Sequence, residues 1–431
     1  MNQIPLLVVS DCKGNIFEVP EYRMAGMSLN RFKLPVSGDL IELPEGSDLF
    51  RLPDRVPIGY DPRTKDFVPL ETYKGKKVFA VGAFMSPAYL QVLTSACRTL
   101  PGAPRLPLYC YTAAGWMNGK FYVPAMRIDE DIRQDYRNFD LCKINKLAKA
   151  LPSKFPGNRL VKHLVENCVL RYGCPAARNF IMGRWECPIP TSRTCNAFCL
   201  GCISKQDKDS GFVASHERIT FTPTVEEIVG FTVPHLQKAP RPVVSFGQGC
   251  EGEPLLEGEL LVAAVKEIRK RTSRGIINLN TNGSLPDVVE KLCEAGLDSI
   301  RVSMNSAREK FYNAYYRPRG YCFDDVKESV RILRRYGRWA SINYLVFPGF
   351  TDTREEIQNL SALIKDSNLS MIQTRNLNID PDYYREKAGL SDWDHGEVIG
   401  IPEWVNYLRT NHAGVRLGYF NPPYNVMKSS V

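Results

Sequence analysis

The feature that most constrains the fold of this 431-residue chain is an alternation of apolar and amphipathic segments beyond residue 188. Five segments have the length and apolar content of buried strands: 243–246, 276–280, 299–304, 340–347 and 371–373. Between them, apolar residues recur every three or four positions, as on one face of a helix. This alternation predicts an α/β fold with a parallel sheet or barrel, whose functional residues lie at the carboxyl ends of the strands.

Local signals mark the ends of the predicted helices. Pro286 and Thr353 stand where helices are expected to begin, because Pro suits the first turn and Thr caps free backbone N–H groups. Gly296 and Gly337 stand where helices are expected to end, because Gly readily adopts the left-handed conformation. We therefore expect a core of strand and helix units over 188–384, with a C-terminal extension over 385–431 that packs on it.

The first 157 residues show a different pattern. Short apolar runs, many aromatic residues and frequent Pro and Gly predict an N-terminal mixed α+β domain over 1–157, which would bind substrate or a partner. A helical connector that contains cysteines is expected over 158–187.

The longest uncharged run, 78–97, is long enough to span a bilayer. Its polar residues and the Ser86-Pro87 pair favour instead a soluble segment: a strand over 78–84, a turn, and then a helix. The first residues carry no basic leader, so a secretory signal is not expected. These features predict a cytoplasmic protein with no membrane partner.

Composition excludes a disordered or fibrous chain, because 44% of the residues are hydrophobic and 24% are charged. The formal net charge of +9 suits anionic ligands. The basic residues form no tail or stripe, and no RNA-binding module is recognisable, so nucleic acid is not indicated as a partner.

Six of the 13 cysteines fall within residues 168–202, which indicates metal chemistry in a reducing compartment. Three of them, Cys195, Cys199 and Cys202, have the spacing C-x3-C-x2-C. Three thiolates at this spacing can hold three corners of an iron–sulfur cube and leave its fourth iron open to a chelator. Zinc is the alternative, but a structural zinc site needs a fourth ligand at paired spacing. The four-cysteine ferredoxin run is also absent.

Together with later segments, this loop resembles the radical SAM (S-adenosylmethionine) enzyme superfamily. After the 243–246 strand comes Gly249-Cys250-Glu251-Gly252-Glu253-Pro254, which is similar to the family's Gly-Gly-Glu-Pro segment. Thr281-Asn282-Gly283, Ser303-Met304-Asn305 and residues 346–352 resemble motifs at later strand ends. The resemblance covers about 188–378 and assigns no subfamily.

The resemblance implies a partial parallel (β/α)6-type barrel and a 4Fe-4S cluster held by Cys195, Cys199 and Cys202. It also implies reductive cleavage of S-adenosylmethionine to a 5′-deoxyadenosyl radical, which abstracts hydrogen from an unidentified small-molecule, peptide or protein substrate. Such an enzyme is oxygen-sensitive and needs an electron donor such as flavodoxin or ferredoxin. The residues that the resemblance places around the cofactor are Gly252, Glu253, Pro254, Asn282, Ser303, Asn305 and Gly349.

These residue types also suit ordinary structural roles. Glu253 is also suited to a solvated helix start, Asn282 to a tight turn, and Ser303 and Asn305 to ordinary strand positions. The chain departs from the family pattern at Gly201, where an aromatic residue near adenine is usual, and at Glu251, where the first glycine of the motif is usual.

The other clustered thiols, Cys168, Cys174 and Cys187, suggest an auxiliary iron–sulfur cluster, with packing in the core as the alternative. Cys250 is open between a fourth ligand, a thiol that faces substrate and a space-filler. The five histidines fall outside recognisable motifs and are expected to be structural.

The expected substrate residues are Gln373 and Arg375, which follow the start of the last predicted strand. Arg375 can clamp a carboxylate or phosphate, or form a surface ion pair. Two alternatives to a metabolite or peptide enzyme stay open. One is a radical SAM enzyme that modifies RNA, and the other is a non-catalytic iron–sulfur or zinc protein.

Overall fold

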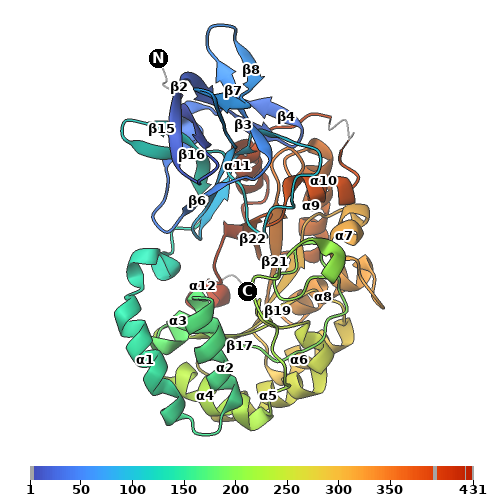
Figure 1. Cartoon of the computed structure of the whole chain (residues 1–431). Coiled ribbons are helices and arrows are strands. Elements are labelled where there is room, and N and C mark those ends of the chain that lie inside the picture. The colour runs from blue at the N-terminus through green and yellow to red at the C-terminus, as the bar shows by residue number, and fades with distance from the viewer. Residues whose placement is uncertain (1–3, 392–395, 423, 430–431) are drawn as a thin grey trace.

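A computed structural model describes residues 4–391, 396–422 and 424–429. Figure 1 shows a β-rich N-terminal domain above an α/β domain, with a helical connector along one side of the latter. No helix in these described ranges is long and apolar enough to cross a bilayer.

The N-terminal domain is built on a nine-stranded sheet with the order β12-β16-β15-β1-β2-β7-β14, in which β5 pairs with β16 and β8 with β7. Its strands are β1 (Leu6–Ser10), β2 (Ile16–Met24), β5 (Leu40–Glu42), β7 (Arg55–Asp61), β8 (Asp66–Pro69), β12 (Tyr89–Gln91), β14 (Cys97–Thr99), β15 (Gly115–Met117) and β16 (Lys120–Arg127). Small sheets contain β3 (Gly26–Ser28), β4 (Arg31–Lys33), β6 (Asp48–Arg51), β9 (Thr72–Tyr73), β10 (Lys76–Lys77), β11 (Val81–Phe84) and β13 (Thr94–Ser95).

The helix expected after Ser86-Pro87 is wrong, because this segment forms β12, β13 and β14. Each of these strands pairs with a distant segment: β12 with β16, β13 with β3 and β14 with β7. A short apolar run does not by itself distinguish a buried strand from a helix. The pairing partners therefore decide the outcome here.

Three helices occupy the range predicted as a connector, 158–187: α2 (Arg159–His163), the π-helix η4 (Leu164–Arg171) and α3 (Pro175–Ile181). The helix before them, α1 (Leu141–Lys154), lies within the range predicted for the N-terminal domain. Ile144 and Ala148 of α1 pack into the main core of the α/β domain. From residue 4 to Arg127 the described elements are strands and one short 3-10 helix.

The α/β domain contains a seven-stranded parallel sheet with its strands in chain order. The strands are β17 (Glu186–Ile189), β18 (Val243–Phe246), β19 (Ile276–Thr281), β20 (Ser299–Met304), β21 (Trp339–Val346), β22 (Met371–Asn376) and β23 (Arg416–Gly418). The five predicted strands are confirmed. The two edge strands, β17 with four residues and β23 with three, were not predicted. Since β23 joins the sheet, the C-terminal extension contributes to the core.

Helices α4, α5, α6, α8 and α9 follow one another around the outside of the sheet (Figure 1). The helices after β17 are α4 (Val225–Lys238), α5 (Gly258–Arg271), α6 (Pro286–Ala295), α7 (Glu309–Tyr316), α8 (Phe323–Arg335), α9 (Arg354–Ser367), α10 (Pro381–Lys387), α11 (Ile401–Asn411) and α12 (Tyr424–Ser429). The expected boundaries are confirmed where Pro286 begins α6, Thr353 caps α9 and Gly296 ends α6 at φ 111°.

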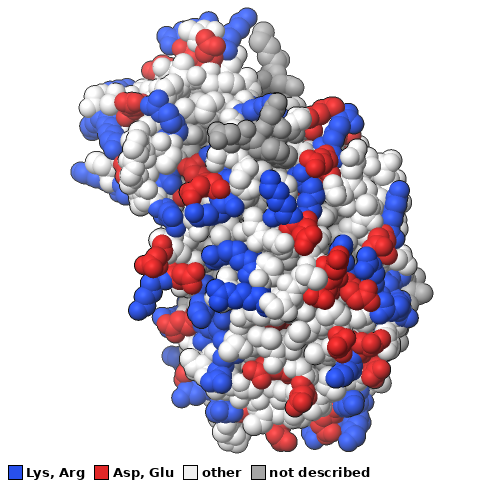
Figure 2. All heavy atoms as spheres, turned by 90° about the vertical axis from the view of Figure 1, so that its right-hand side faces the viewer, with Lys and Arg blue, Asp and Glu red and all other residues white. Residues whose placement is uncertain are grey.

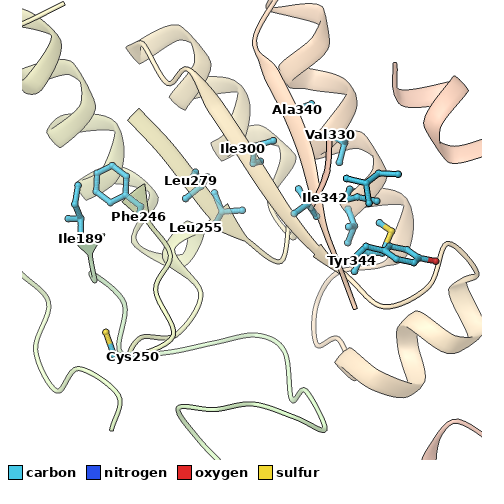
Figure 3. Packing of buried hydrophobic residues seen from close by; sticks show 14 of the residues in the cluster. Ile189, Phe246, Cys250, Leu255, Leu279, Ile300, Val330, Ala340, Ile342 and Tyr344 are labelled. Carbon is cyan, nitrogen blue, oxygen red and sulfur yellow. The ribbon is translucent and has the colours of Figure 1, made fainter. Parts of the chain in front are cut away.

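The two faces of the sheet differ in polarity. Buried apolar side chains from successive strands, including Phe246, Leu279, Ile300 and Ile342, pack in the main core (Figure 3). Alternate residues of these strands carry polar side chains, and Ser303 lies opposite Asn343, which lies opposite Gln373. Because successive strand residues point to opposite faces, the sheet has one apolar face and one polar face.

The N-terminal domain docks where β21 and β22 end. Arg55 forms a buried ion pair of 2.7 Å with Asp380. The Gln91 backbone N–H donates to Asn376 Oδ1 at 2.9 Å, and the Leu29 N–H donates to the Pro348 carbonyl at 2.9 Å. This domain therefore covers part of the sheet edge where a parallel fold places its chemistry.

Candidate functional site

The three motif cysteines lie on the irregular loop after β17 and line one cavity of about 160 Å³. The loop is fixed by the end of α7, because the Phe198 and Leu200 N–H groups donate to the Tyr316 and Tyr315 carbonyls, both at 2.9 Å. The Arg319 N–H donates to the Asn196 carbonyl at 2.9 Å. A loop without regular structure thus keeps a defined path.

The segment that resembles the Gly-Gly-Glu-Pro motif is joined directly to the cysteine loop. The Gly252 N–H donates to the Ser192 carbonyl at 2.7 Å, and the Glu253 N–H donates to the Thr194 carbonyl at 2.8 Å. A β-carbon at position 252 would lie 1.8 Å from the Thr194 oxygen, so only glycine fits there. The resemblance at this position therefore has a steric basis in this chain.

Glu251, the departure from the motif, has a defined structural role. Its buried carboxylate accepts hydrogen bonds from the Thr191, Ser192 and Gln248 N–H groups at 2.7, 2.9 and 2.6 Å. These bonds tie the start of the cysteine loop to the loop after β18. Burial raises the pKa of Glu251 to about 7.

Glu253 caps the 3-10 turn η6 (Pro254–Glu257), but it is buried rather than solvated, with 3% of its surface exposed. Its carboxylate accepts hydrogen bonds from the Leu255 N–H at 3.0 Å, the Asn282 N–H at 2.8 Å and the Thr281 hydroxyl. Burial raises the pKa of this carboxyl to about 7. A buried carboxylate that faces a strand end is suited to receive a cationic group.

The structure places Asn282 at the cysteine loop, where its amide donates to Asn196 Oδ1 at 2.8 Å. Asn305 lies deeper: its amide donates to the Phe311 carbonyl and to the Tyr384 hydroxyl, while its buried Oδ1 has no hydrogen-bond partner among the described residues. Ser303 is half-buried on the polar face of β20. Asn282 is thus a turn residue that also contacts the cysteine loop.

Gly349 has φ +87°, and a β-carbon there would lie 2.5 Å from the Leu29 backbone nitrogen. The resemblance places this glycine around the cofactor. The close contact in the structure is with the N-terminal domain. That docking is itself sufficient to require glycine at this position.

Gly201 also has a specific neighbour. A β-carbon at position 201 would lie 2.6 Å from the Tyr315 hydroxyl oxygen of α7. An aromatic side chain from α7 therefore occupies the space beside the position where the family usually carries its own aromatic residue.

The charges around the cysteine cavity suit a negatively charged metal–thiolate group. Arg193, Lys205, Arg218 and Arg317 line it, and Arg218 Nη2 lies 3.8 Å from Cys202 Sγ. Burial, with the nearby Glu253 carboxylate, raises the pKa of Cys195 to about 11. Without a metal this thiol is protonated, and metal binding is what would convert it to the thiolate. The donor set and the surrounding cations therefore fit a three-thiolate cluster.

A second cavity, of about 330 Å³, lies on the polar face of the sheet. Arg301 and Arg375 line it together with Ser245 and Asn280. Gln373, predicted beside Arg375, is fully buried and accepts a hydrogen bond from Arg301 Nη1 at 2.9 Å. Burial and the neighbouring Arg375 lower the pKa of Arg301 to about 9. Sequence reasoning missed Arg301, although a charged residue two positions before Ser303 marks the polar face of that strand.

The other three clustered cysteines, Cys168, Cys174 and Cys187, do not line one common site. Cys174 and Cys187 line the larger cavity, whereas Cys168 lies beside Cys250 with 3.5 Å between the sulfur atoms. Among the described residues, the group of His, Cys, Asp or Glu whose ligand atoms all lie within 4.8 Å of one another is His163, Cys168 and Cys250.

Residues 189–361 match the family model described as the Radical SAM superfamily. The matched segment is less than half of the 431-residue chain and resembles a radical SAM domain, a kind of enzyme domain that uses a 4Fe-4S cluster and S-adenosylmethionine. No curated protein matches the chain.

Solved structures that resemble the chain include anSMEcpe with bound AdoMet, at 19% identity and a TM-score of 0.35, covering 44% of this chain and 51% of that one. SuiB of Streptococcus suis bound to S-adenosylmethionine has 13% identity and a TM-score of 0.38, covering 66% and 67%. HydG, a maturase of the [FeFe]-hydrogenase, has 12% identity and a TM-score of 0.38, covering 67% of both chains. The chain thus spans between half and two thirds of the length of these proteins, and at these scores the likeness carries no functional argument.

Proposed function

We propose that this chain is a radical SAM enzyme that binds a 4Fe-4S cluster through Cys195, Cys199 and Cys202 and acts on a substrate that carries a carboxylate or phosphate. The observation that best supports this proposal is the backbone connection between the two motifs. The N–H groups of Gly252 and Glu253 donate hydrogen bonds to carbonyl groups of the cysteine loop. When bound, the cluster and S-adenosylmethionine supply the electron and the 5′-deoxyadenosyl radical that abstracts hydrogen from the substrate.

The chain's own residues bind and orient the cofactors. Glu253 is held in place by Thr281 and Asn282 and would accept hydrogen bonds from the amino group of S-adenosylmethionine. A positive partner offsets the burial that raises the pKa of Glu253 and so favours its charged form. Pro254, Ser303, Asn305 and Gly349 are the remaining proposed contacts, and the unpartnered Oδ1 of Asn305 is an available acceptor.

The residues that line the polar cavity support the proposed class of substrate. Two guanidinium groups, from Arg301 and Arg375, line a space of about 330 Å³. Gln248, from the loop that carries Gly252 and Glu253, lines the same cavity and connects it to the cofactor motifs. Arginine pairs recognise planar anionic groups. A small molecule or peptide with such a group would therefore bind with its reactive carbon toward the strand ends.

The sheet would curve as a partial barrel, with the N-terminal domain closing its mouth. Pro87 of that domain lines the larger cavity, and Arg55 anchors the domain to Asp380 beyond β22. Closure would exclude water from a reactive radical. The proposed electron donor is a flavodoxin or ferredoxin, in the cytoplasm.

The first test is formation of 5′-deoxyadenosine by anaerobically reconstituted, reduced protein supplied with S-adenosylmethionine. We expect product from the parent and none from a variant with Cys195, Cys199 and Cys202 changed to Ala. A matched control changes three exposed cysteines, as Cys12→Ala, Cys142→Ala and Cys322→Ser, and should retain activity. If the parent with a reducible cluster forms no product and S-adenosylmethionine leaves its EPR signal unchanged, the cofactor assignment fails.

The substrate class is tested with Arg301→Gln and Arg375→Gln. Both variants should cleave S-adenosylmethionine at the parent's uncoupled rate but lose turnover stimulated by anionic substrates, by about tenfold or more each. Figure 2 shows Lys and Arg side chains mixed with Asp and Glu over the face in view. Association with RNA that weakens steeply with salt would replace this substrate class with an RNA-modifying activity.

A further inference from the structure

His163, Cys168 and Cys250 form a compact group of metal-type ligands away from the cysteine loop. Their ligand atoms all lie within 4.8 Å of one another, and the two sulfur atoms are 3.5 Å apart. All three residues are buried, with exposures of 8%, 3% and 5%. They come from two segments that are far apart in the chain, the connector and the loop after β18.

One of the two ring nitrogens of the buried His163 imidazole has no hydrogen-bond partner among the described residues. Its Nδ1 lies 3.0 Å from the Asn167 amide, while its buried Nε2 has no hydrogen-bond partner among the described residues. A buried polar atom without a partner costs free energy. With the Asn167 amide oriented so that its oxygen accepts from Nδ1–H, Nε2 has a lone pair for a metal, as ligating histidines commonly have.

The local backbone explains how these residues meet. His163 ends α2, and residues Leu164–Arg171 form a π-helix. A π-helix makes i→i+5 hydrogen bonds, which place residues five apart above one another, and His163 and Cys168 are five apart. Such helices are rare and occur frequently at functional sites. This π-helix therefore directs the imidazole and the thiol toward the same point.

We propose that His163, Cys168 and Cys250 bind one zinc ion, which ties the helical connector to the loop that carries Glu251, Gly252 and Glu253. Two thiolates and a neutral imidazole around a divalent cation have no net charge, as a buried site requires. The close sulfur atoms suit two thiolates on one ion at about 2.3 Å each. In a 4Fe-4S cluster each thiolate binds a different iron, which would hold the sulfur atoms further apart.

The fourth tetrahedral position is available to water. Among the described residues no fourth His, Cys, Asp or Glu joins the group, and Cys174 lines the larger cavity instead. Zinc bound in this way would hold the position of Cys250, whose carbonyl accepts from the Ile219 N–H at 2.8 Å. The proposed role is structural, and it holds whether or not the proposed substrate class is correct.

The test measures zinc and iron per chain in full-length protein, beside the variant with Cys195, Cys199 and Cys202 changed to Ala. We expect about one zinc per chain in both proteins. Cys168→Ser, Cys250→Ser and His163→Gln should lower zinc content about tenfold or more. Cys187→Ser and Cys293→Ser, which change buried cysteines outside the group, should leave it unchanged.

A second measurement keeps all three proposed zinc ligands in place. The metal-free variant with Cys195, Cys199 and Cys202 changed to Ala is titrated with Co²⁺ alone, and thiolate-to-cobalt charge-transfer absorption is expected at one ion per chain. Zinc at background level with no such absorption overturns the proposal. A Cys168–Cys250 disulfide in the parent, or iron that disappears together in the Cys168, Cys174 and Cys187 variants, overturns it in favour of a redox pair or an auxiliary cluster.

Discussion

The carbonyl oxygen of Thr194 and the α-carbon of Gly252 lie in such close contact that a β-carbon at position 252 would come within 1.8 Å of that oxygen. The adjacent Glu253 N–H donates to the same oxygen at 2.8 Å. One backbone oxygen thus joins the loop that carries the proposed cluster ligands to the loop that carries the proposed cofactor carboxylate. The relative position of the two motifs depends on this contact.

Gly252→Ala should therefore displace the cysteine loop. We expect reconstituted protein to retain less iron and to form 5′-deoxyadenosine about tenfold more slowly or worse, a barrier change of about 1.4 kcal/mol. Gly414→Ala is the control, because no atom lies within 4 Å of a β-carbon at that position. Normal iron content and turnover in Gly252→Ala would show that the contact is dispensable.

Gly201 and Tyr315 should behave as a coupled pair. Gly201→Ala brings a β-carbon to 2.6 Å from the Tyr315 hydroxyl, and Tyr315→Phe removes that hydroxyl. The single Gly201→Ala variant should lose cluster occupancy, and the double variant should regain most of it, because residues in contact are not additive. Iron content and the intensity of the EPR signal measure cluster occupancy in the single and the double variant. Additive losses would mean that Gly201 is required for another reason.

The ion pair between the domains should contribute measurably to stability. Arg55 and Asp380 pair at 2.7 Å with side-chain exposures of 3% and 2%. Arg55→Leu leaves a buried carboxylate without its cation. We expect the free energy of unfolding, measured with denaturant, to fall by about 3–5 kcal/mol. Adding Asp380→Leu should restore part of this loss. Lys120→Leu, which breaks an exposed pair with Glu42, should cause no measurable change.

Asp352 should make stability depend on pH. Burial raises the pKa of this carboxyl from 3.8 to about 6, so the folded state favours the protonated form. The stability that it contributes is complete below pH 4 and is lost as the pH rises through 6. Relative to the parent, Asp352→Asn should gain up to about 3 kcal/mol between pH 4 and pH 7. Denaturant unfolding across this range tests it, with the exposed Asp287→Asn as control. Parallel curves for parent and Asp352→Asn would refute the assignment.

Predictions from the sequence succeeded where the signal is local. The parallel strands could be located from short apolar runs, and the helix ends from residues such as Pro286 and Gly296. Both signals can be recognised without knowledge of neighbouring elements. The resemblance also pointed to Gly252, where the structure adds a steric reason for glycine, because a β-carbon would lie 1.8 Å from the Thr194 oxygen.

Predictions were incomplete where distant segments meet. The residues of β12 and β13 form strands because β16 and β3 pair with them. Arg301 lines the polar cavity because two strands bring it beside Gln373, and Gly349 is held against Leu29 by docking of the N-terminal domain. None of these partners lies near the residue in the chain.

The sequence by itself determined the class of chemistry, since the spacing of Cys195, Cys199 and Cys202 limits which metal centres their thiols can reach. Only the tertiary structure decided which groups are brought together: Cys168 with Cys250, Glu253 with Thr281, and Arg301 with Arg375. The physical reason is that spacing along the chain restricts local geometry, whereas contacts between distant residues depend on packing of the whole core.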